Sequence, residues 1–480
     1  MENTKQLHYG EWFINGEETS INGVIEINPL ENSYSLTLYS DTALSIPYYP
    51  DMVSGKTYDG KAFTLYKCRT GGSRSTSMVH DYKDKFTYTI TSDYLLEGVA
   101  FDKVEDILIK DAYFRVTNLD KWAFQNAVDV KFEEEDAEHI ITTKMLEDIA
   151  HRNEEFDLKI TYMTYPDYKY KFTSSLTITT YVQVELNFKK PTDIVHAHSL
   201  MNQFRDFCSL CTTVPTFIEE IRAVPHYPND QEIKFPIKIY GQAVDTNLNR
   251  NKEDLKLPFD YISLEKIKDT FDTCMGNWFA KNEKLKPVID CYSSVKYHRT
   301  SYERHFLNLV QALEAFHRLT RKNNILPRAE HRARVKTILE AVPPEYQELV
   351  KGRLSYANEP TLHDRLEELL TPNDDYSHPE AGRYHHLFTS DYESKEALII
   401  DIKNTRNYNT HFDERLREKT VKGEKLVQLT MLLAAMIEYY LLTELEMDEK
   451  TILDITWDKV RQISTRKELF THMKDGKVSM

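Results

Sequence analysis

The spacing of apolar residues changes near residue 280, and this change constrains the fold more than any other feature of the sequence. In the first part of the chain apolar and polar residues alternate, as at 24–27 and 34–39 on either side of an Asn-Pro turn. A period of two is typical of β-strands with one buried face. After residue 295, apolar residues recur every three or four positions from Tyr302 to Phe316, as on one face of a helix. The sequence therefore predicts an α+β chain, with strands first and helices second.

Two domains are expected, because 480 residues exceed the size at which one hydrophobic core stops growing. We place a β-rich, sandwich-like amino-terminal domain with a few helices at 1–285, and an all-α helical bundle at 286–480. Further strands are predicted at 62–68, 85–91, 112–116, 157–165, 168–188 and 233–240. Further helices are predicted after the cap candidate Thr192 and at 263–281, 328–342, 361–370, 394–408 and 424–445, with Pro343-Pro344 as a break.

The charge of the chain limits its partners. The sequence has 61 Lys and Arg against 76 Asp and Glu, a net charge of −15. A chain this acidic does not coat nucleic acid nonspecifically, so any such site must be a local basic patch. One segment fits that requirement: ten Lys or Arg face only three acids between Lys296 and Lys336. We interpret it as the best RNA-binding segment, and the alternative is a solvated helix face.

Cysteine usage and hydropathy favour a cytoplasmic protein. The five cysteines are unevenly spaced, and residues 1–10 lack the basic and apolar regions of a signal peptide. The most apolar stretch, 426–445, is interrupted by Gln428, Glu438 and Glu444, so we expect a buried helix and no membrane contact.

A metal site is not expected. Cys208 and Cys211 have the spacing of a zinc-ligand pair, but Cys274 and Cys291 are too far apart to complete it. The first two cysteines also fit the apolar stripe of a helix, where thiols act as small hydrophobic groups. We therefore expect no metal and no cofactor.

The segment Arg406-Asn407-Tyr408-Asn409-Thr410-His411 contains the candidate catalytic residues Arg406, Asn407 and His411. An imidazole, with an ordinary pKa of about 6.5, exchanges protons near neutral pH, while a guanidinium stays charged and grips phosphate oxygens. The spacing alone is weak evidence, because Arg74 with His80, Arg299 with His305 and Arg466 with His472 are similar pairs. Only the pair at 406 and 411 has Asn directly after Arg and follows an apolar helical run.

Helix geometry shapes the proposed chemistry. At about 100° per residue, Asn407 and His411 share one face, whereas Arg406 lies roughly 140° away and its side chain must swing back. His411 would act as the general base on a ribose 2′-OH, and Arg406 would stabilise the phosphorane. The alternative is a solvated helix end whose Arg and His pair with nearby acids, namely Asp401, Asp413 or Glu414.

Further residues are predicted to contact the substrate. Arg299, Arg304 and Arg318 belong to the basic segment, and Tyr408 lies between the catalytic candidates. Glu314 is on the same predicted helix as Arg318, where it would line the cleft or form an ion pair with an arginine.

Two segments resemble a known family. Residues 399–411, with their helix, Arg-Asn pair and spaced His, resemble the ribonuclease motif of the HEPN superfamily. Residues 311–316 (Gln-Ala-Leu-Glu-Ala-Phe) resemble the opening helix of its ApeA-like branch, and the β-rich first part resembles the ApeA amino-terminal domain.

The resemblance implies an endoribonuclease of bacterial anti-phage, abortive-infection defence. It implies a homodimer formed through the HEPN domain, cleavage of cellular RNA with tRNA as a frequent target, and a phage-derived trigger sensed by the β-rich domain. Two other interpretations stay open: a non-catalytic helical module that binds a nucleotide, RNA or a partner protein, and carbohydrate or protein recognition by the β-rich domain with the helical bundle as a dimerisation scaffold.

Overall fold

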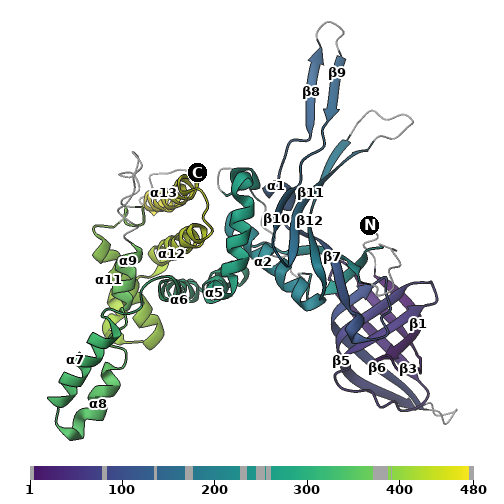
Figure 1. Cartoon of the computed structure of the whole chain (residues 1–480), viewed down its shortest axis with the longest axis horizontal. Coiled ribbons are helices and arrows are strands. Elements are labelled where there is room, and N and C mark those ends of the chain that lie inside the picture. The colour runs from purple at the N-terminus through teal and green to yellow at the C-terminus, as the bar shows by residue number, and fades with distance from the viewer. Residues whose placement is uncertain are drawn as a thin grey trace. The chain divides into compact units, whose positions relative to one another are not determined.

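The computed structural model divides into two compact units (Figure 1). Unit 1 comprises 1–258 and 262–276, and unit 2 comprises 259–261 and 277–480. The structure describes residues 5–77, 84–133, 138–167, 177–226, 235–244, 255, 261–370, 387–390 and 392–474, the last eleven by their backbone alone. Helix α5 (Phe271–Tyr297) continues across the division, so the boundary predicted between 285 and 286 falls inside a helix.

Among the described residues of unit 1, six antiparallel strands close into a barrel. Around it they run β6, β3, β2, β1, β4 and β5, and β5 pairs back onto β6. Their bounds are β1 (Gln6–Ile14), β2 (Ile21–Asn28), β3 (Ser33–Ser40), β4 (Met52–Thr57), β5 (Ala62–Ser77) and β6 (Asp84–Glu97). The predicted β-rich class is confirmed. The strands form a closed barrel because β5 is long enough to pair with both neighbours and shifts register between Thr70 and Ser73, where a bulge bends it.

The barrel core is packed around Trp12. Its side chain is fully buried and stacks on Phe63 with ring centroids 6.2 Å apart. Gly55, on the neighbouring strand β4, makes room for this ring: a β carbon there would lie 2.5 Å from Trp12 Cε3. Only glycine fits at this position without displacing the indole ring.

Six further strands extend the same sheet from β6 in the order β14, β13, β7, β12, β11 and β10. Their bounds are β7 (Leu108–Val116), β10 (Ile149–Arg152), β11 (Phe156–Asp167), β12 (Thr177–Asp193), β13 (Ile218–Pro225) and β14 (Ile237–Gly241). A separate two-stranded sheet pairs β8 (Val128–Glu133) with β9 (Glu138–Thr143).

Helix α2 (Ile194–Thr212) packs on β7, β12 and β13. Its cap is Asp193, whose side chain accepts from the backbone N–H groups of Val195 and His196. The predicted cap, Thr192, is therefore wrong: Thr192 still pairs with Ile109 in the sheet, so the helix starts one residue later. The shorter helical pieces of unit 1 are η1 (Val104–Asp106), α1 (Leu119–Trp122), α4 (Leu264–Ile267) and η2 (Lys268–Thr270).

Unit 2 is helical, as predicted. After α5 its helices are α6 (Tyr302–Thr320), α7 (Arg328–Glu340), α8 (Pro344–Leu354), α9 (Leu362–Leu369), α11 (Lys395–His411), η3 (Glu414–Lys419), α12 (Gly423–Glu444) and α13 (Glu449–Lys474). Helices α8 and α13 were not predicted. The Pro343-Pro344 pair, predicted as a break, begins α8, because proline is favoured in the first turn, where its missing N–H costs nothing.

Helix α12 is the core helix of unit 2 and packs against α6 and α13. Its length and composition alone would allow it to cross a membrane, but 72% of its most apolar window is buried within the structure. Its one buried carboxylate, Glu438, accepts hydrogen bonds from Tyr292, Lys296 and Lys459 at 2.6, 3.1 and 2.8 Å. The carboxylate of Glu438 is thus paired inside this core.

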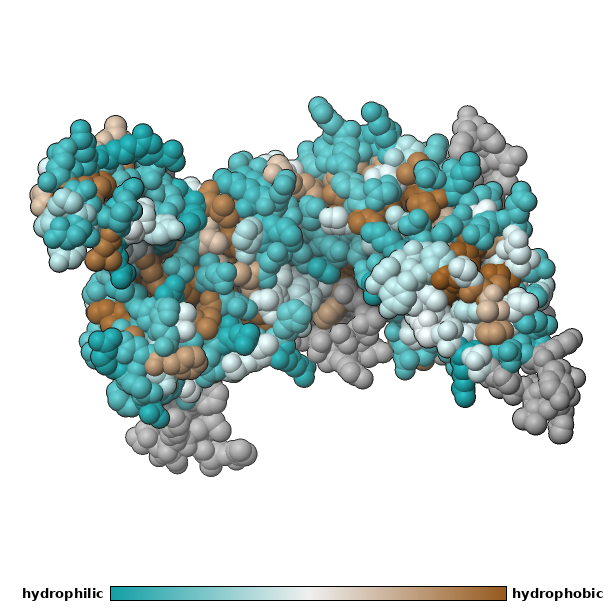
Figure 2. All heavy atoms as spheres, turned by 90° about the horizontal axis from the view of Figure 1, so that it is seen from below, coloured by the Kyte–Doolittle hydropathy of each residue, from teal (hydrophilic) through white to brown (hydrophobic). Residues whose placement is uncertain are grey.

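The surface is mainly hydrophilic. On the face shown in Figure 2, small apolar patches lie among hydrophilic side chains. This agrees with a charged fraction of 29%.

Candidate functional site

Helix α11 carries the catalytic candidates at its carboxyl end. It begins at the cap Ser394, which accepts from the backbone N–H of Ala397, and it ends at His411. Phe412 follows in the left-handed region (φ 52°), and its N–H donates to the carbonyl of Tyr408 at 2.7 Å. This conformation stops the helix directly after His411.

A buried hydroxyl connects the end of α11 to the start of α12. Thr405 is fully buried, and its Oγ1 accepts a hydrogen bond from the backbone N–H of Val421 at 3.0 Å. The intervening residues include η3, which packs against α11. The last turn of α11 is therefore held from its buried side, while its other side faces solvent.

Two contacts position Arg406. Its Nη1 donates to Oδ1 of Asn407 at 3.1 Å, and its Nη2 lies 3.9 Å from Oε2 of Glu314 on α6. The first contact turns the guanidinium toward Asn407, which shares a helix face with His411. The side chain keeps about a third of its surface exposed, 32%. The cation is thus held in place and remains accessible to an anion.

His411 is exposed, and the acids considered as its partners have other partners. Asp401 pairs with Lys425 at 2.8 Å, Asp413 with Arg415 at 2.7 Å and Glu414 with Arg417 at 3.5 Å. Among the hydrogen bonds and ion pairs of the described residues, none involves the imidazole of His411. The imidazole is therefore accessible to a substrate.

Comparison with known families decides the identity of both parts. Residues 307–451 match the family described as Apea-like HEPN, and residues 7–278 match the family described as ApeA N-terminal domain 1. The chain belongs to the ApeA N-terminal domain 1 family and also contains an Apea-like HEPN domain. The Apea-like HEPN match contains Glu314, Arg406, Asn407 and His411, and HEPN domains include ribonucleases of defence systems. A search of curated proteins and a search of solved structures each returned no match.

The other predicted substrate residues of the HEPN domain are spread along α6. Arg299 precedes this helix, Arg304 is in its first turn, and Arg318 is in its last turn with an ion pair to Glu359 at 2.7 Å. Arg304 and Arg318 are separated by about 21 Å of helix at 1.5 Å per residue. Tyr408 lies in the last turn of α11, and its ring contacts that of Phe412. The structure therefore brings Glu314 to Arg406, while Arg299 and Arg304 lie toward the far end of α6.

The other Arg-His pairs of similar spacing have different settings. Arg299 lies between α5 and α6, and the ring of His305 bonds to the carbonyl of His298 at 3.0 Å. Arg74 lies in β5, and its partner His80 is outside the described residues. Arg466 and His472 are on α13, where side chains are not described.

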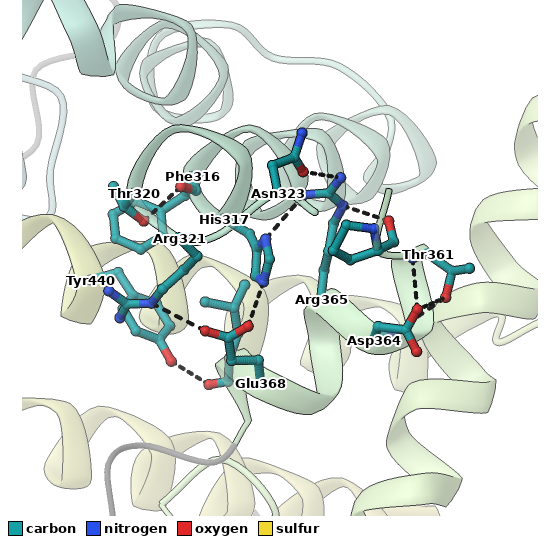
Figure 3. Close-up of polar contacts among 12 residues, drawn as sticks. Phe316, His317, Thr320, Arg321, Asn323, Thr361, Asp364, Arg365, Glu368 and Tyr440 are labelled. Carbon is teal, nitrogen blue, oxygen red and sulfur yellow. Dashed lines mark hydrogen bonds and ion pairs between the residues drawn. The ribbon is translucent and has the colours of Figure 1, made fainter. Parts of the chain in front are cut away.

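A buried polar cluster in the HEPN domain was not predicted. His317 on α6 and Arg365 on α9 are both buried, and Arg365 Nη1 donates to Nδ1 of His317 at 3.0 Å (Figure 3). Because a guanidinium only donates, Nδ1 accepts and Nε2 is the donor to Glu368 Oε2 at 2.8 Å. The sequence offered one sign that His317 is buried: it follows Phe316, which belongs to the apolar face of α6.

One cavity of the HEPN domain is separate from the catalytic candidates. It has a volume of about 860 Å³ and lies between the first half of α11, the start of α12 and the middle of α13. Its described lining includes Leu429, Lys422 and Lys425 but neither Arg406 nor His411. The motif at the end of α11 therefore lies outside this cavity.

Helix α2 carries the cysteine pair considered as metal ligands and also His196 and His198, and each of these side chains is buried or has another partner. Cys208 and Cys211 are buried on α2, and burial raises the pKa of the Cys208 thiol. His196 pairs with Glu155, while His198 contacts the hydroxyl of Tyr94 at 3.0 Å. Burial and the nearby Arg205 lower the pKa of His198 to about 4. Within the described part of the chain, His, Cys, Asp and Glu side chains form no cluster of three suited to a metal ion.

Proposed function

We propose that this protein is a metal-independent endoribonuclease whose catalytic residues are Arg406, Asn407 and His411. The observation that supports this most is the arrangement at the end of α11 in the HEPN match. An accessible guanidinium is held toward Asn407, and an accessible imidazole lies one turn further on the same face as Asn407. A cation and a titratable base at one solvent-facing helix end are the groups that RNA cleavage needs.

The proposed reaction has one displacement step. The imidazole of His411 takes the proton of a ribose 2′-OH, and the 2′ oxygen attacks the adjacent phosphorus. The bond from phosphorus to the 5′ oxygen breaks, and the 5′ oxygen takes a proton. The products are a 2′,3′-cyclic phosphate and a 5′-hydroxyl. Arg406 stabilises the negative charge of the phosphorane, and Asn407 orients the guanidinium.

The family match suggests a biological setting for this activity. We propose that the enzyme cleaves cellular RNA, with tRNA as the first candidate, as part of anti-phage defence. We also propose a homodimer formed through the HEPN domain, in which a second copy brings its own Arg406 and His411 to one cleft. The ApeA N-terminal domain, with its closed barrel and attached strands, would restrain or sense a phage-derived trigger.

The test compares the full-length protein with His411→Ala and Arg406→Ala variants on mixed RNA. We expect each variant to lose at least about a hundredfold in cleavage rate while it stays folded, because each removes a group that acts in the transition state. Excess chelator should leave the wild-type rate unchanged. The product ends identify the chemistry, since this mechanism requires cyclic phosphates.

Other outcomes separate the alternatives. Full activity in either variant would refute the assigned roles. Intact RNA together with measurable RNA binding would instead support a non-catalytic binding module, in which the same Arg and His contact phosphate without breaking a bond.

A further inference from the structure

Helices α7 and α8 form a helical hairpin, here called the arm (residues 325–358). The two helices pack against each other and are joined by a short connection at 341–343. Neither helix contains a buried residue. In Figure 1 the arm extends away from α12 and α13, the core helices of the same unit. Helices of 13 and 11 residues are marginal in water without a packed face. A solvent-exposed hairpin of this kind therefore needs a rigid base.

A buried asparagine closes the base of the arm. Asn358 is 9% exposed and joins the two ends of the hairpin. Its Oδ1 accepts from the backbone N–H of Leu326 at 2.8 Å, and its Nδ2 donates to the carbonyl of Leu326 at 3.0 Å. Its own carbonyl accepts from the N–H of Ile325 at 2.9 Å. These three bonds hold the start and end of the arm together.

The buried cluster of Figure 3 fixes this base to the helical bundle. Arg365 Nη2 donates to Oδ1 of Asn323 at 2.7 Å, and Arg365 Nε donates to the carbonyl of Pro360 at 3.1 Å. Its remaining bond reaches His317 on α6. Helix α6 also carries Glu314, the ion-pair partner of Arg406, about one turn before His317. Packed contacts thus set the position of the arm relative to the catalytic helix.

The exposed face of α8 combines aromatic, aliphatic and cationic groups. Tyr346 and Leu349 on α8, and Tyr356 two residues after its end, are 54%, 64% and 75% exposed. Tyr346, Leu349 and Arg353 follow each other at spacings of three and four, so they share one helix face. Arg353 therefore interrupts what would otherwise be an apolar stripe. A protein partner would favour a continuous apolar face, whereas rings beside a guanidinium suit stacked bases and phosphates.

The cations of the arm fall into two groups. Arg334, Lys336 and Lys351 pair with carboxylates on their own helices at 3.0, 3.7 and 3.3 Å. Arg328, Arg332 and Arg353 are exposed and have no ion pair within the described part of the chain. Exposed cations without a carboxylate partner in a chain of net charge −15 are complementary to a polyanion.

We propose that the arm binds single-stranded RNA, with Arg328, Arg332 and Arg353 on phosphates and Tyr346 and Tyr356 stacked on bases. This rests on the proposed function, which makes RNA the substrate, and it assigns to α7 and α8 the capture of RNA beyond the cleaved linkage. The rigid base of the arm then fixes the bound strand relative to α6, which carries Glu314 beside Arg406.

The experiment uses the full-length protein with His411→Ala, so that bound RNA stays intact, and a fluorescein-labelled single-stranded RNA of about 20 nucleotides and mixed sequence. The test variant combines Arg328→Ala, Arg332→Ala and Arg353→Ala. The matched control combines Arg334→Ala, Lys336→Ala and Lys351→Ala, which makes the same change in net charge on the same two helices. Circular dichroism confirms that both remain helical.

We expect the test variant to bind at least about tenfold more weakly at ~0.1 M salt and to show a flatter dependence of log Kd on log salt, because phosphate contacts release counterions. The control should change Kd by less than about threefold. A second variant, Tyr346→Ala with Tyr356→Ala, should lose about tenfold without changing the salt slope, since stacking involves no counterions.

Three outcomes would overturn the proposal: unchanged RNA binding in the test variant, equal losses in test and control, and no RNA binding by the full-length protein. If the test variant sediments differently from the wild type but binds RNA with the same affinity, the arm forms a contact between two copies of the protein. The wild-type cleavage assay reports separately on catalysis. If the wild type cleaves RNA and the arm variants bind RNA normally, the proposed function stands and the proposal for the arm fails. If the arm variants lose RNA binding but the wild type does not cleave RNA, the proposal for the arm stands and the proposed function fails.

Discussion

Arg406 and Glu314 come from different helices, and the guanidinium Nη2 and the carboxylate Oε2 lie 3.9 Å apart. Both side chains are 32% exposed, so water screens the pair and its strength is modest. The main effect of this ion pair is to hold the end of α11 close to α6. The catalytic candidate and the helix that supports the arm are therefore linked by a contact between charged groups.

Replacing Glu314 by Gln should reduce RNA cleavage about fivefold, which corresponds to about 1 kcal/mol. The amide keeps the shape of the side chain but removes its charge, so Arg406 is held by Asn407 alone and samples more positions. The measurement is kcat on RNA. Asp290→Asn is the control, because Asp290 is also an exposed partner of a cation, Lys286 on α5. A faster variant would show that Glu314 restrains Arg406 instead of positioning it.

Thr405→Val should destabilise unit 2 by about 1–3 kcal/mol. The substitution keeps the volume of a fully buried side chain but removes the hydroxyl that accepts from the N–H of Val421, which would leave a buried donor without a partner. Thermal unfolding of the full-length protein measures the effect. Thr410→Val, an exposed position on the same helix, should be nearly neutral. Equal stability of the two variants would argue against a structural role of this bond.

Glu438 should make the stability of unit 2 depend on pH in the acidic range. Burial alone raises the pKa of this carboxyl, but the ammonium groups of Lys459 and Lys296 and the hydrogen bonds from Lys459 and Tyr292 outweigh burial and lower it to about 2. The ordinary value is 4.5. Because the folded-state pKa is the lower one, the stabilisation is fully present above about pH 4.5 and is lost as pH falls toward 2. Its size is about 3 kcal/mol.

The control for this prediction is Glu438→Gln, compared with the wild type by unfolding at pH 7 and pH 3. At pH 7 the variant should be less stable by about 3–5 kcal/mol, because two half-buried cations lose their partner. At pH 3 the difference should shrink. A difference that is the same at both pH values would contradict the assigned ionisation.

Gly55→Ala should destabilise the barrel by at least about 1–3 kcal/mol, because the new β carbon would overlap the ring of Trp12 at 2.5 Å and force the core to repack. Gly72→Ala offers the matched control: Gly72 is also in a barrel strand, and a β carbon there meets no atom within 4 Å. Calorimetry of both variants measures the difference. Equal unfolding temperatures of the two variants would mean that the side chains around Trp12 can rearrange without a loss of stability.

Local patterns in the sequence were sufficient for the fold class and for most elements of unit 2. The period of apolar residues predicted α6, α9, α11 and α12, because a helix that packs on a core must repeat its apolar face every three to four residues. Helix α7 was also predicted, although it buries no residue. The Arg-Asn and His of α11 were recognisable because their spacing depends only on one helix. Helix α8 was missed because its apolar residues do not pack on a core and therefore do not form a buried helix face.

Contacts between distant residues were beyond the reach of sequence patterns. The barrel closes through pairing of β5 with β6 along with a register shift, and alternation along one strand does not reveal which strand pairs with it. The same holds for Glu314 beside Arg406, and for His317 beside Arg365. The sequence by itself determined which residues are helical or extended and where a base and a cation occur together. Only the tertiary structure decided which side chains from separate helices meet, because that depends on how the packed helices orient their faces in space.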